Sequence, residues 1–468
     1  MQPVVNGIPT VGPHRHAAAV ERLSASYRAI PPGAPVRLAK RTSNLFRPRT
    51  RLDVPGLDVS GLDRVISIDP EGRTADVQGM CTYEDLVDAT LPHGLMPYVV
   101  PQLRTITLGG AVTGLGIESS SFRNGLPHES VLEMDVLTGS GEVVTAAPGG
   151  PNDELFRTFP NSYGSLGYAT RIRIALEPVQ PRVRLRHVRV PIEKLDATVA
   201  RLVETHEHDG DPVDFLDGVA FSPDEVYLTL GTWDPTEGPG SDYTGQRVFY
   251  RSLQERSEDV LTTLDYLWRW DTDWFWCSRA FGAQHPAVRR VWPRRWRRSD
   301  VYHRLVGLEH RFGAYARVQR LRGRPDVERV VQDVEIPVGR VADFLGWFDE
   351  RVGMRPVWLC PLRLRDADGP GSARAWPLYP LEPGRTYVNV GFWGAVPIAP
   401  GAEDGDVNRA IEDAVTAHGG HKSLYSDAYY TREEFDRLYA GSTLTEVRRI
   451  HDPDDRLTGL YEKAVARR

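Results

Sequence analysis

Small residues and hydroxyl side chains gather in one stretch of the chain, from Pro101 to Ser121. Its sequence is PQLRTITLGGAVTGLGIESSS, and its four glycines are Gly109, Gly110, Gly114 and Gly116. Glycine adopts positive φ and lets the backbone approach a bound group closely, so such a stretch can wrap a large flat cofactor with its own amides. The pattern therefore predicts a cofactor-binding segment.

A second glycine cluster, NSYGSLG at 161–167, precedes an alternating stretch at 169–176 that is typical of a strand. The first stretch superficially resembles the GxGxxG fingerprint of dinucleotide-binding Rossmann domains. That fingerprint needs a strand before it, a helix after it and an acidic residue beyond the next strand. Here PQL precedes the glycines and ESSS follows them. We therefore disfavour a Rossmann site.

Arginine and tryptophan alternate in a third stretch, RRVWPRRWRR from Arg289 to Arg298, after five aromatic residues between Trp268 and Trp276. Such a run can contact a phosphate or an anionic membrane surface. A solvated face with tryptophans packed beneath it explains the pattern equally well. A peripheral membrane contact through Arg289–Arg298 stays open at this point.

The elements that position these stretches follow from periodicity and turn residues. Val20, Leu23 and Tyr27 recur at helical spacing and predict a helix over 16–27, which ends before the PPG turn at 31–33. The alternating segments and Gly-rich turns predict strands at 36–39, 57–69 and 74–79, helices at 82–91 and 153–159, and a hairpin over 131–145.

A domain boundary is expected at 178–182, where Pro178 and Pro181 bracket an extended linker. Beyond it, alternation predicts strands at 183–191, 219–221, 226–232, 329–336, 357–364 and 386–392. Helices are expected at 193–207 and 341–352, and the tail from Val407 reads as helical. Strands grouped with helices in this way favour an α+β fold.

Composition excludes several classes of protein. Lysine and arginine total 57 against 63 acidic residues, so the net charge of −6 gives no general reason to expect a nucleic-acid partner. Cys81, Cys277 and Cys360 lie far apart, which argues against a disulfide scaffold or a metal site and favours a reducing compartment. No stretch approaches the roughly 20 apolar residues of a membrane helix. We expect a cytoplasmic protein.

Several short motifs together resemble a known family. LAKRTSNLFR at 38–47, LPHG at 91–94, GIESSS at 116–121 and GSLG at 164–167 look like a flavin domain of the vanillyl-alcohol oxidase superfamily, the FAD-binding PCMH type. In the second half, VVQD at 330–333, PVWLCP at 356–361 and LYSDAYYTREEF at 424–435 resemble the delta-24-sterol reductase branch. The resemblance extends from about Val36 to the C-terminus.

The resemblance implies an α+β fold in three parts: a two-part FAD-binding domain over 1–178, a substrate or cap domain with an antiparallel sheet over 179–420, and a C-terminal segment over 421–468 that returns to the flavin domain. It also implies the FAD contacts, first in the pyrophosphate loop and then in the two glycine clusters. They are Thr42, Ser43, Asn44, Leu45, Gln102, Thr105, Thr107, Gly109, Gly110, Gly114, Gly116, Ile117, Ser119, Ser120, Gly164, Leu166, Gly167 and Ile172.

The mode of attachment differs from that of many relatives, which bind FAD covalently through a histidine or a cysteine. Residues 40–47 contain no histidine and residues 98–110 contain no cysteine. We therefore expect non-covalent FAD. No metal is expected.

The chemistry implied by the resemblance is hydride transfer between flavin N5 and a substrate carbon, for which a side chain must supply or remove a proton. The candidates are Tyr425, Asp427, Tyr429 and Glu118, each of which could instead have a packing or capping role. Cys360 is expected to be a buried inert thiol. His128 and His421 receive no role.

The leading expectation is the reduction of an isolated C=C bond in a sterol-like or other lipidic or small substrate, with NADPH as a possible donor. An FAD-dependent oxidase or dehydrogenase of an alcohol or sugar is the enzymatic alternative. A flavin-binding or anionic-surface-binding protein without turnover is the alternative from another class. The sequence leaves the oligomeric state open.

Overall fold

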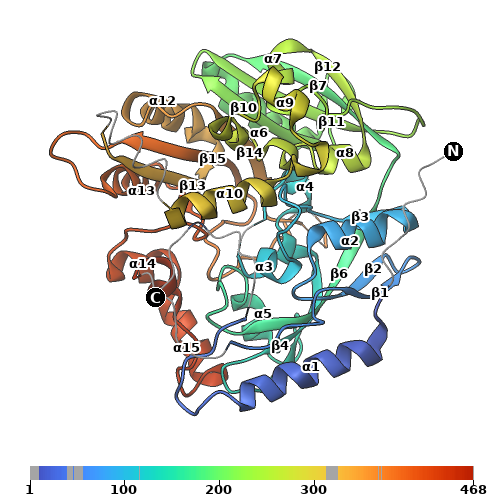
Figure 1. Ribbon diagram of the computed structural model, residues 1–468, viewed down its shortest axis with the longest axis vertical. Helices are drawn as coiled ribbons and strands as arrows, with labels where there is room; N and C mark the ends of the chain where they lie inside the picture. Colours follow the sequence, from blue (N-terminus) through green and yellow to red (C-terminus); the bar gives the residue numbers. More distant parts are fainter. Residues whose placement is uncertain are drawn as a thin grey trace.

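Two antiparallel sheets organise the chain (Figure 1). The computed structural model describes residues 10–39, 46, 56–114, 116–312, 325–366, 368–369 and 371–466. The first sheet has the order β1-β2-β6-β4-β5, and β3 pairs with the far part of β6. Its strands are β1 (Val65–Asp69), β2 (Thr74–Gln78), β3 (Leu95–Pro97), β4 (Val131–Leu137), β5 (Val143–Ala146) and β6 (Tyr168–Pro178).

The second sheet has eight strands in the order β12-β7-β11-β10-β14-β15-β13-β16. It begins only four residues after β6 ends at Pro178. Its strands are β7 (Arg182–Val190), β10 (Phe215–Ser222), β11 (Glu225–Asp234), β12 (Glu258–Thr262), β13 (Val327–Pro337), β14 (Val357–Arg363), β15 (Thr386–Pro397) and β16 (His421–Lys422). A separate ribbon joins β8 (Glu207–His208) to β9 (Asp211–Pro212). The α+β fold class is confirmed.

Helices of the first part are placed by capping and by apolar spacing. In α1 (Gly12–Arg28), Ala19, Leu23 and Tyr27 form the buried side, and the Tyr27 hydroxyl donates to the Gly139 carbonyl at 2.6 Å. Thr82 caps α2 (Tyr83–Thr90) by accepting the Asp85 amide. The remaining helices of this part are α3 (Leu108–Thr113), α4 (Ser121–Asn124) and α5 (Asp153–Thr158).

The two faces of the second sheet meet different partners. One face packs beneath α6 (Ile192–Thr205), α12 (Val341–Arg351) and α13 (Asp406–Ala417) in an apolar core. The other face shares a continuous core with the first sheet, in which Val77 and Ile172 belong to the same cluster as Trp358. We call the second sheet with its helices the cap and this second face the inner face.

Further short helices complete the cap and the C-terminal segment. In Figure 1, α10 crosses the front of the molecule where the upper and lower halves meet. These helices are α7 (Phe249–Glu255), α8 (Thr263–Leu267), α9 (Pro286–Val291), α10 (Ser299–Phe312), α14 (Arg432–Leu438), α15 (Gly441–His451) and α16 (Leu460–Ala464). The 3₁₀ turns are η1 (Leu91–His93), η2 (Pro127–Ser130), η3 (Asp271–Asp273), η4 (Cys277–Phe281), η5 (Arg294–Trp296) and η6 (Val338–Arg340).

The C-terminal segment lies against the first part of the chain. The Ser140 amide donates to the His451 carbonyl at 3.0 Å, and Arg448 donates to the Ser165 carbonyl at 2.8 Å. Val36 forms a bridge with Leu457. Segments separated by more than 280 residues therefore build one unit.

Some expected elements are wrong in extent. The stretch 57–69 is a strand only over Val65–Asp69, and 36–39 forms only isolated bridges at Val36 and Leu38. The glycine stretch contains α3, in which Thr107 caps the first turn by accepting the Gly110 amide at 3.2 Å. The helix α3 begins at the Thr107 cap and continues through the residues Ala111, Val112 and Thr113 that follow the two glycines.

Candidate functional site

The predicted pyrophosphate loop, Thr42, Ser43, Asn44 and Leu45, lies outside the described residues. Phe46, the next residue, is described. Its amide donates to the Tyr425 carbonyl at 3.0 Å, it bridges Ser426, and its ring lies 5.9 Å from the Tyr425 ring. Phe46 therefore lies directly beside Tyr425.

Close packing explains two glycines of the first cluster. A Cβ at Gly109 would lie 2.5 Å from the Gly79 carbonyl oxygen, and one at Gly116 would lie 2.6 Å from the Pro127 ring. Gly110 is exposed, and a Cβ there would meet only the capping Thr107 hydroxyl at 2.9 Å. Gly110 is therefore the solvent-accessible position of this cluster. Gly109 and Gly116 instead allow close packing against Gly79 and Pro127.

The polar side chains of the first cluster bind other parts of the protein. Gln102 donates to the Ile117 carbonyl at 2.5 Å, Ser120 donates to the Tyr98 carbonyl at 2.8 Å, and the Ser119 hydroxyl lies 2.7 Å from the Tyr266 hydroxyl. These bonds fix the loop that follows α3. Two more of the predicted FAD contacts flank α3: the half-buried Thr105 precedes the helix, and Gly114 lies at its C-terminal end.

The second glycine cluster joins the first through the backbone, because the Tyr163 amide donates to the Thr113 carbonyl at 2.8 Å. Gly164 and Gly167 have φ of +76° and +139°, a region that favours glycine. Leu166 is fully buried beside them. Ile172, the last predicted FAD contact, is fully buried inside β6, where it pairs with Val77 and Met134.

Buried polar atoms gather where these segments meet the C-terminal segment. Among the described residues, Asn161 Oδ1, Ser162 Oγ, Ser165 Oγ and Ser426 Oγ are buried and find no hydrogen-bond partner. A buried polar atom without a partner is unfavourable by about 1–3 kcal/mol and usually indicates a bound water or ligand. Serine hydroxyls suit phosphate and sugar oxygens. The residues present therefore fit an FAD cofactor.

A row of polar side chains crosses the inner face of the cap sheet. Thr229 lies opposite His187 on one neighbouring strand and opposite Asp217 on the other. In the same way, Asn389 lies opposite Cys360 and opposite Glu335 on its two neighbouring strands. Glu335 in turn pairs with His421, while Asp217 and Cys360 flank the pair Gly218 and Leu359. Paired residues share one face of a sheet. The whole row is buried: His187, Thr229, Asp217, Cys360, Asn389, Glu335 and His421.

Asp333 and Tyr425 form a hydrogen-bonded pair next to this row. Asn389 donates to Asp333 at 2.8 Å, and the Trp393 indole donates to the Tyr425 hydroxyl at 2.9 Å. Burial raises the pKa of Asp333 to about 6, against the hydrogen bonds from Asn389 and Tyr425. Burial and the Asp333 charge raise the pKa of Tyr425 well above its usual value. Tyr425 therefore keeps its proton at neutral pH.

Glu335 and His421 end the polar row. Glu335 accepts from the Ser423 hydroxyl at 2.7 Å, and its other oxygen lies 3.1 Å from His421 Nε2. Burial raises the pKa of Glu335 well above its usual value and lowers the pKa of His421 to about 3. Burial therefore disfavours the charged form of both groups, and His421 is a neutral imidazole at neutral pH. His421, given no role from sequence, belongs to this cluster.

Glu118 lies in a buried cluster that joins the polar row at Asp217. Arg269 Nη2 is 2.7 Å from Glu118 and 2.8 Å from Asp217, and the Trp270 indole donates to Asp217 at 2.9 Å. Burial raises the pKa of Glu118, and the Arg269 charge opposes that rise. Cys360 is fully buried near this cluster, and burial raises the pKa of its thiol. Its thiol is therefore held in the unreactive protonated form.

The other two catalytic candidates lie beside α13. The Tyr429 amide donates to the Glu412 carboxylate at 3.0 Å, and the same carboxylate binds Lys422 at 2.7 Å. Lys422 also donates to the Asp427 carbonyl. The structure thus brings Tyr425 to Phe46 and the inner face, whereas the backbone at Asp427 and Tyr429 is tied to the buried Glu412 and Lys422 pair.

Sequence reasoning missed Asp333, Asn389, Glu335 and Arg269. The sequence contained a signal for two of them. Asp333 and Glu335 are two residues apart in the strand VVQDVEIP and so lie on one side of it, whereas Val334 and Ile336 lie on the other side. Two acidic residues on one side of such a strand indicate a polar site on that face. Arg269, between Trp268 and Trp270, was equally unusual for a buried aromatic stretch.

Comparison of the sequence with known proteins identifies what the chain is similar to. The FAD binding domain family matches residues 15–147. The chain is 25% identical to "Delta(24)-sterol reductase" of Homo sapiens over 412 residues, which is 85% of this chain and 75% of that protein. It is 24% identical to the protein of the same name from Arabidopsis thaliana over 440 residues, 87% of this chain and 76% of that protein.

The chain is an FAD-dependent oxidoreductase. It is similar to delta(24)-sterol reductases across both sheets, as the sequence motifs predicted. This oxidoreductase is also 35% identical to "Cytokinin dehydrogenase 2" of Oryza sativa subsp. japonica over 141 residues, 30% of this chain and 25% of that protein. In its described part the oxidoreductase has no helix long and apolar enough to cross a membrane, and no cluster of side chains suited to a metal ion.

Proposed function

We propose that this enzyme reduces an isolated C=C bond of a sterol-like or other lipidic substrate, with NADPH as the electron donor. The reaction adds a hydride and a proton across the double bond and converts NADPH to NADP⁺. Bound FAD supplies the hydride chemistry. The protein must then hold the cofactor, exclude water and deliver one proton to carbon.

The observation that carries the proposal is the buried Asp333 and Tyr425 pair. A reductase needs a protonated donor beside the substrate, and a neighbouring group with a pKa near the working pH can supply that donor with a new proton. Tyr425 keeps its proton, and the pKa of Asp333 is about 6. We assign Tyr425 as the donor and Asp333 as the group that returns a proton to it.

Trp393 completes this assignment. Its indole N–H points at the Tyr425 oxygen at 2.9 Å, so it stabilises the negative charge that develops there as the proton leaves. The inner face around these residues is buried, which strengthens the interaction. The same tyrosine accepts the amide of Phe46 through its carbonyl, and Phe46 directly follows in sequence the residues expected to bind the FAD pyrophosphate.

The cofactor contacts that support this function come from uncharged groups. The serine hydroxyls at 162, 165 and 426 and the amides of the two glycine clusters would hold the phosphates and sugar without a metal. NADPH needs only transient contact, so the lack of a second nucleotide motif in the sequence is compatible with its role as donor.

A product assay tests the proposal. The holoenzyme is incubated with NADPH and a Δ24-sterol, and the sterol is analysed by mass spectrometry. The expected product is two mass units heavier, formed in equal amount to the NADP⁺. Tyr425→Phe should slow product formation by about 100-fold or more. Absence of the saturated product with any lipidic alkene, while an alcohol is oxidised, would overturn the proposal.

Oxidation of an alcohol is the second candidate, and one observation favours it. Ionised Asp333 could act as a base, as a dehydrogenase requires, and a stretch of 141 residues is 35% identical to a cytokinin dehydrogenase. The two functions differ in pH dependence, because reduction needs the protonated pair and oxidation needs the ionised one. Similarity to sterol reductases over 85% of the chain leads us to prefer reduction.

A further inference from the structure

The arginine and tryptophan stretch divides into an inner and an outer set of side chains. Arg289 is fully buried, binds Asp273 at 2.6 Å and donates to the Gly245 and Tyr243 carbonyls. Arg297 is buried and donates to the Thr244, Gly245, Arg289 and Trp292 carbonyls. These two arginines hold α9 and η5 in place from beneath, and they are not available to a partner.

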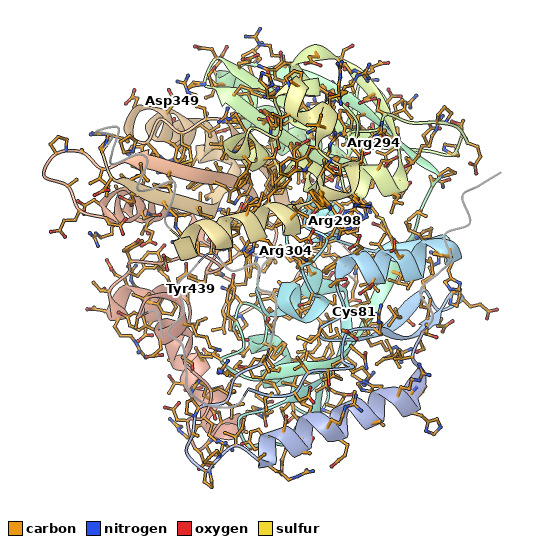
Figure 2. All side chains as sticks on the ribbon, in the orientation of Figure 1. Cys81, Arg294, Arg298, Arg304, Asp349 and Tyr439 are labelled. Atoms are coloured by element: carbon orange, nitrogen blue, oxygen red, sulfur yellow. The ribbon has the colours of Figure 1, made fainter. Side chains whose placement is uncertain are left out.

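The outer set combines apolar and basic side chains. Val291 is 79% exposed and Trp296 is 47% exposed. Arg290 and Arg295 are exposed beside them, and within the described part of the chain neither forms a salt bridge. We call Arg290, Val291, Arg295 and Trp296 the outer patch. Figure 2 labels Arg294 in the upper half of the molecule, and Arg298 and Arg304 near the level where the two halves meet.

We propose that the outer patch docks on the surface of an anionic lipid bilayer. Tryptophan favours the membrane interface, and basic residues near an anionic surface are attracted to it. Val291 projects from the end of α9, where it would enter the acyl boundary while the two arginines meet lipid phosphates. The rest of a chain with net charge −6 is repelled by the same surface, so the patch also sets the orientation.

A second copy of the chain fits the patch less well. In a symmetric dimer the patch would face itself, which brings Arg290 and Arg295 against identical arginines. Nucleic acid offers phosphates but no apolar medium for Val291, and the overall negative charge opposes it. Among the candidate partners, only an anionic bilayer matches both the charged and the apolar members of the patch.

The docking does not depend on the redox chemistry of the enzyme. The inner face of the cap sheet and Tyr425 are not part of the patch. A membrane contact would give the enzyme access to a lipidic substrate, but binding to lipid vesicles can be measured without any turnover. Failure of one proposal therefore leaves the other standing.

The test is co-sedimentation of the FAD-loaded enzyme with phosphatidylcholine vesicles, with and without 30% phosphatidylserine, at low and at high salt. The wild-type enzyme should bind the anionic vesicles, and salt should weaken the binding. Arg290→Glu with Arg295→Glu should lower the partition coefficient at least tenfold. Val291→Ser with Trp296→Ser should lower it at least fivefold and leave less salt-resistant binding.

The matched control is Arg340→Glu with Ile450→Ser, which changes an exposed arginine and an apolar residue that is 63% exposed outside the patch. It should bind as the wild type does. Circular dichroism and FAD content check that every variant is folded. The proposal is overturned if the patch variants bind vesicles like the control, or if light scattering without lipid shows that the patch variants convert a dimer to a monomer.

Discussion

Arg269 and Glu118 form a fully buried ion pair, with 2.7 Å between Arg269 Nη2 and the Glu118 carboxylate. The same nitrogen lies 2.8 Å from Asp217 in the cap sheet. Glu118 lies within the first glycine cluster, and the neighbouring Ser119 carbonyl accepts the Leu216 amide at 2.7 Å. Arg269 therefore ties the cofactor-binding loop to the cap.

Replacement of Arg269 should destabilise the protein strongly. Arg269→Met leaves two buried carboxylates without a counter-charge, and breaking such a buried pair is unfavourable by about 3–5 kcal/mol. The loss should be larger at pH 8 than at pH 5.5, because burial raises the pKa of Glu118, and without the opposing Arg269 charge this carboxyl group must take up a proton to remain buried. Denaturant unfolding of the FAD-loaded enzyme measures it.

The control for this experiment is Arg294→Met. Arg294 pairs with Asp242 at 2.9 Å, but its side chain is 68% exposed, so the change should cost less than about 1 kcal/mol. Equal effects of the two substitutions would contradict the role that we assign to Arg269.

A second contact between the cap and the first part of the chain should make stability pH-dependent. Arg298 binds Glu84 at 2.7 Å and Arg104 binds it at 3.2 Å. Burial raises the pKa of Glu84, but these two arginines outweigh it, so the pKa lies below its ordinary value. A lowered pKa adds stability above the unfolded pKa of about 4.3, and this contribution is lost as pH falls through the folded value.

Glu84→Gln should therefore lower the free energy of unfolding by about 1 kcal/mol at pH 7, and by progressively less below pH 4. Urea unfolding at several pH values follows the difference between variant and wild type. A difference that grows as the pH falls would show the wrong sign and contradict the assignment.

The second glycine cluster should contribute to FAD affinity through its unpartnered hydroxyls. Ser162→Ala with Ser165→Ala removes two buried donors, each worth about 1 kcal/mol, so the FAD dissociation constant should rise about 10- to 30-fold. Fluorescence titration of the apoprotein with FAD measures this. Ser252→Ala is the matched control, because that buried hydroxyl already donates to the Phe249 carbonyl at 2.7 Å. Unchanged affinity in the double variant would exclude these serines from the FAD site.

FAD should leave the protein on acid denaturation. Neither loop used for covalent attachment in many relatives contains the required histidine or cysteine. After precipitation with trichloroacetic acid, the yellow colour should remain in the supernatant. A yellow pellet would show a covalent bond at a position that the sequence does not indicate.

The pH dependence of substrate reduction should report Asp333. Protonated Asp333 supports proton delivery by Tyr425, so the single-turnover rate should fall as pH rises through about 6. Asp333→Asn should remove this limb of the profile. Tyr387→Phe is the control, since Tyr387 is a buried tyrosine of the same sheet whose hydroxyl accepts the Glu382 amide. A rate that rises with pH would favour the oxidative function.

Local patterns predicted much of this molecule, because strands and helices leave a signal within a few residues. The α+β class, the hairpin over 131–145 and the helix ending near Tyr27 were all visible. The glycine clusters could be recognised because their residue types relate directly to backbone geometry. The location of the protein in the cytoplasm stays a prediction.

The rest depends on contacts between distant segments. Arg269 meets Glu118 across 151 positions, and Tyr379 meets Glu335 across 44. No pattern within one segment encodes such a meeting. The polar row on the inner face arises from the register of seven strands, each of which contributes one residue, so no single strand reveals it. The division of the arginine stretch into buried and exposed members likewise follows from tertiary packing.

The central claim is that electrons flow from NADPH to a carbon–carbon double bond. An anaerobic spectral titration of the FAD-loaded enzyme tests it most directly. NADPH should bleach the flavin absorbance, and a Δ24-sterol should restore it with one sterol consumed per flavin. Bleaching by an alcohol but not by NADPH, with recovery only when air is admitted, would contradict the account.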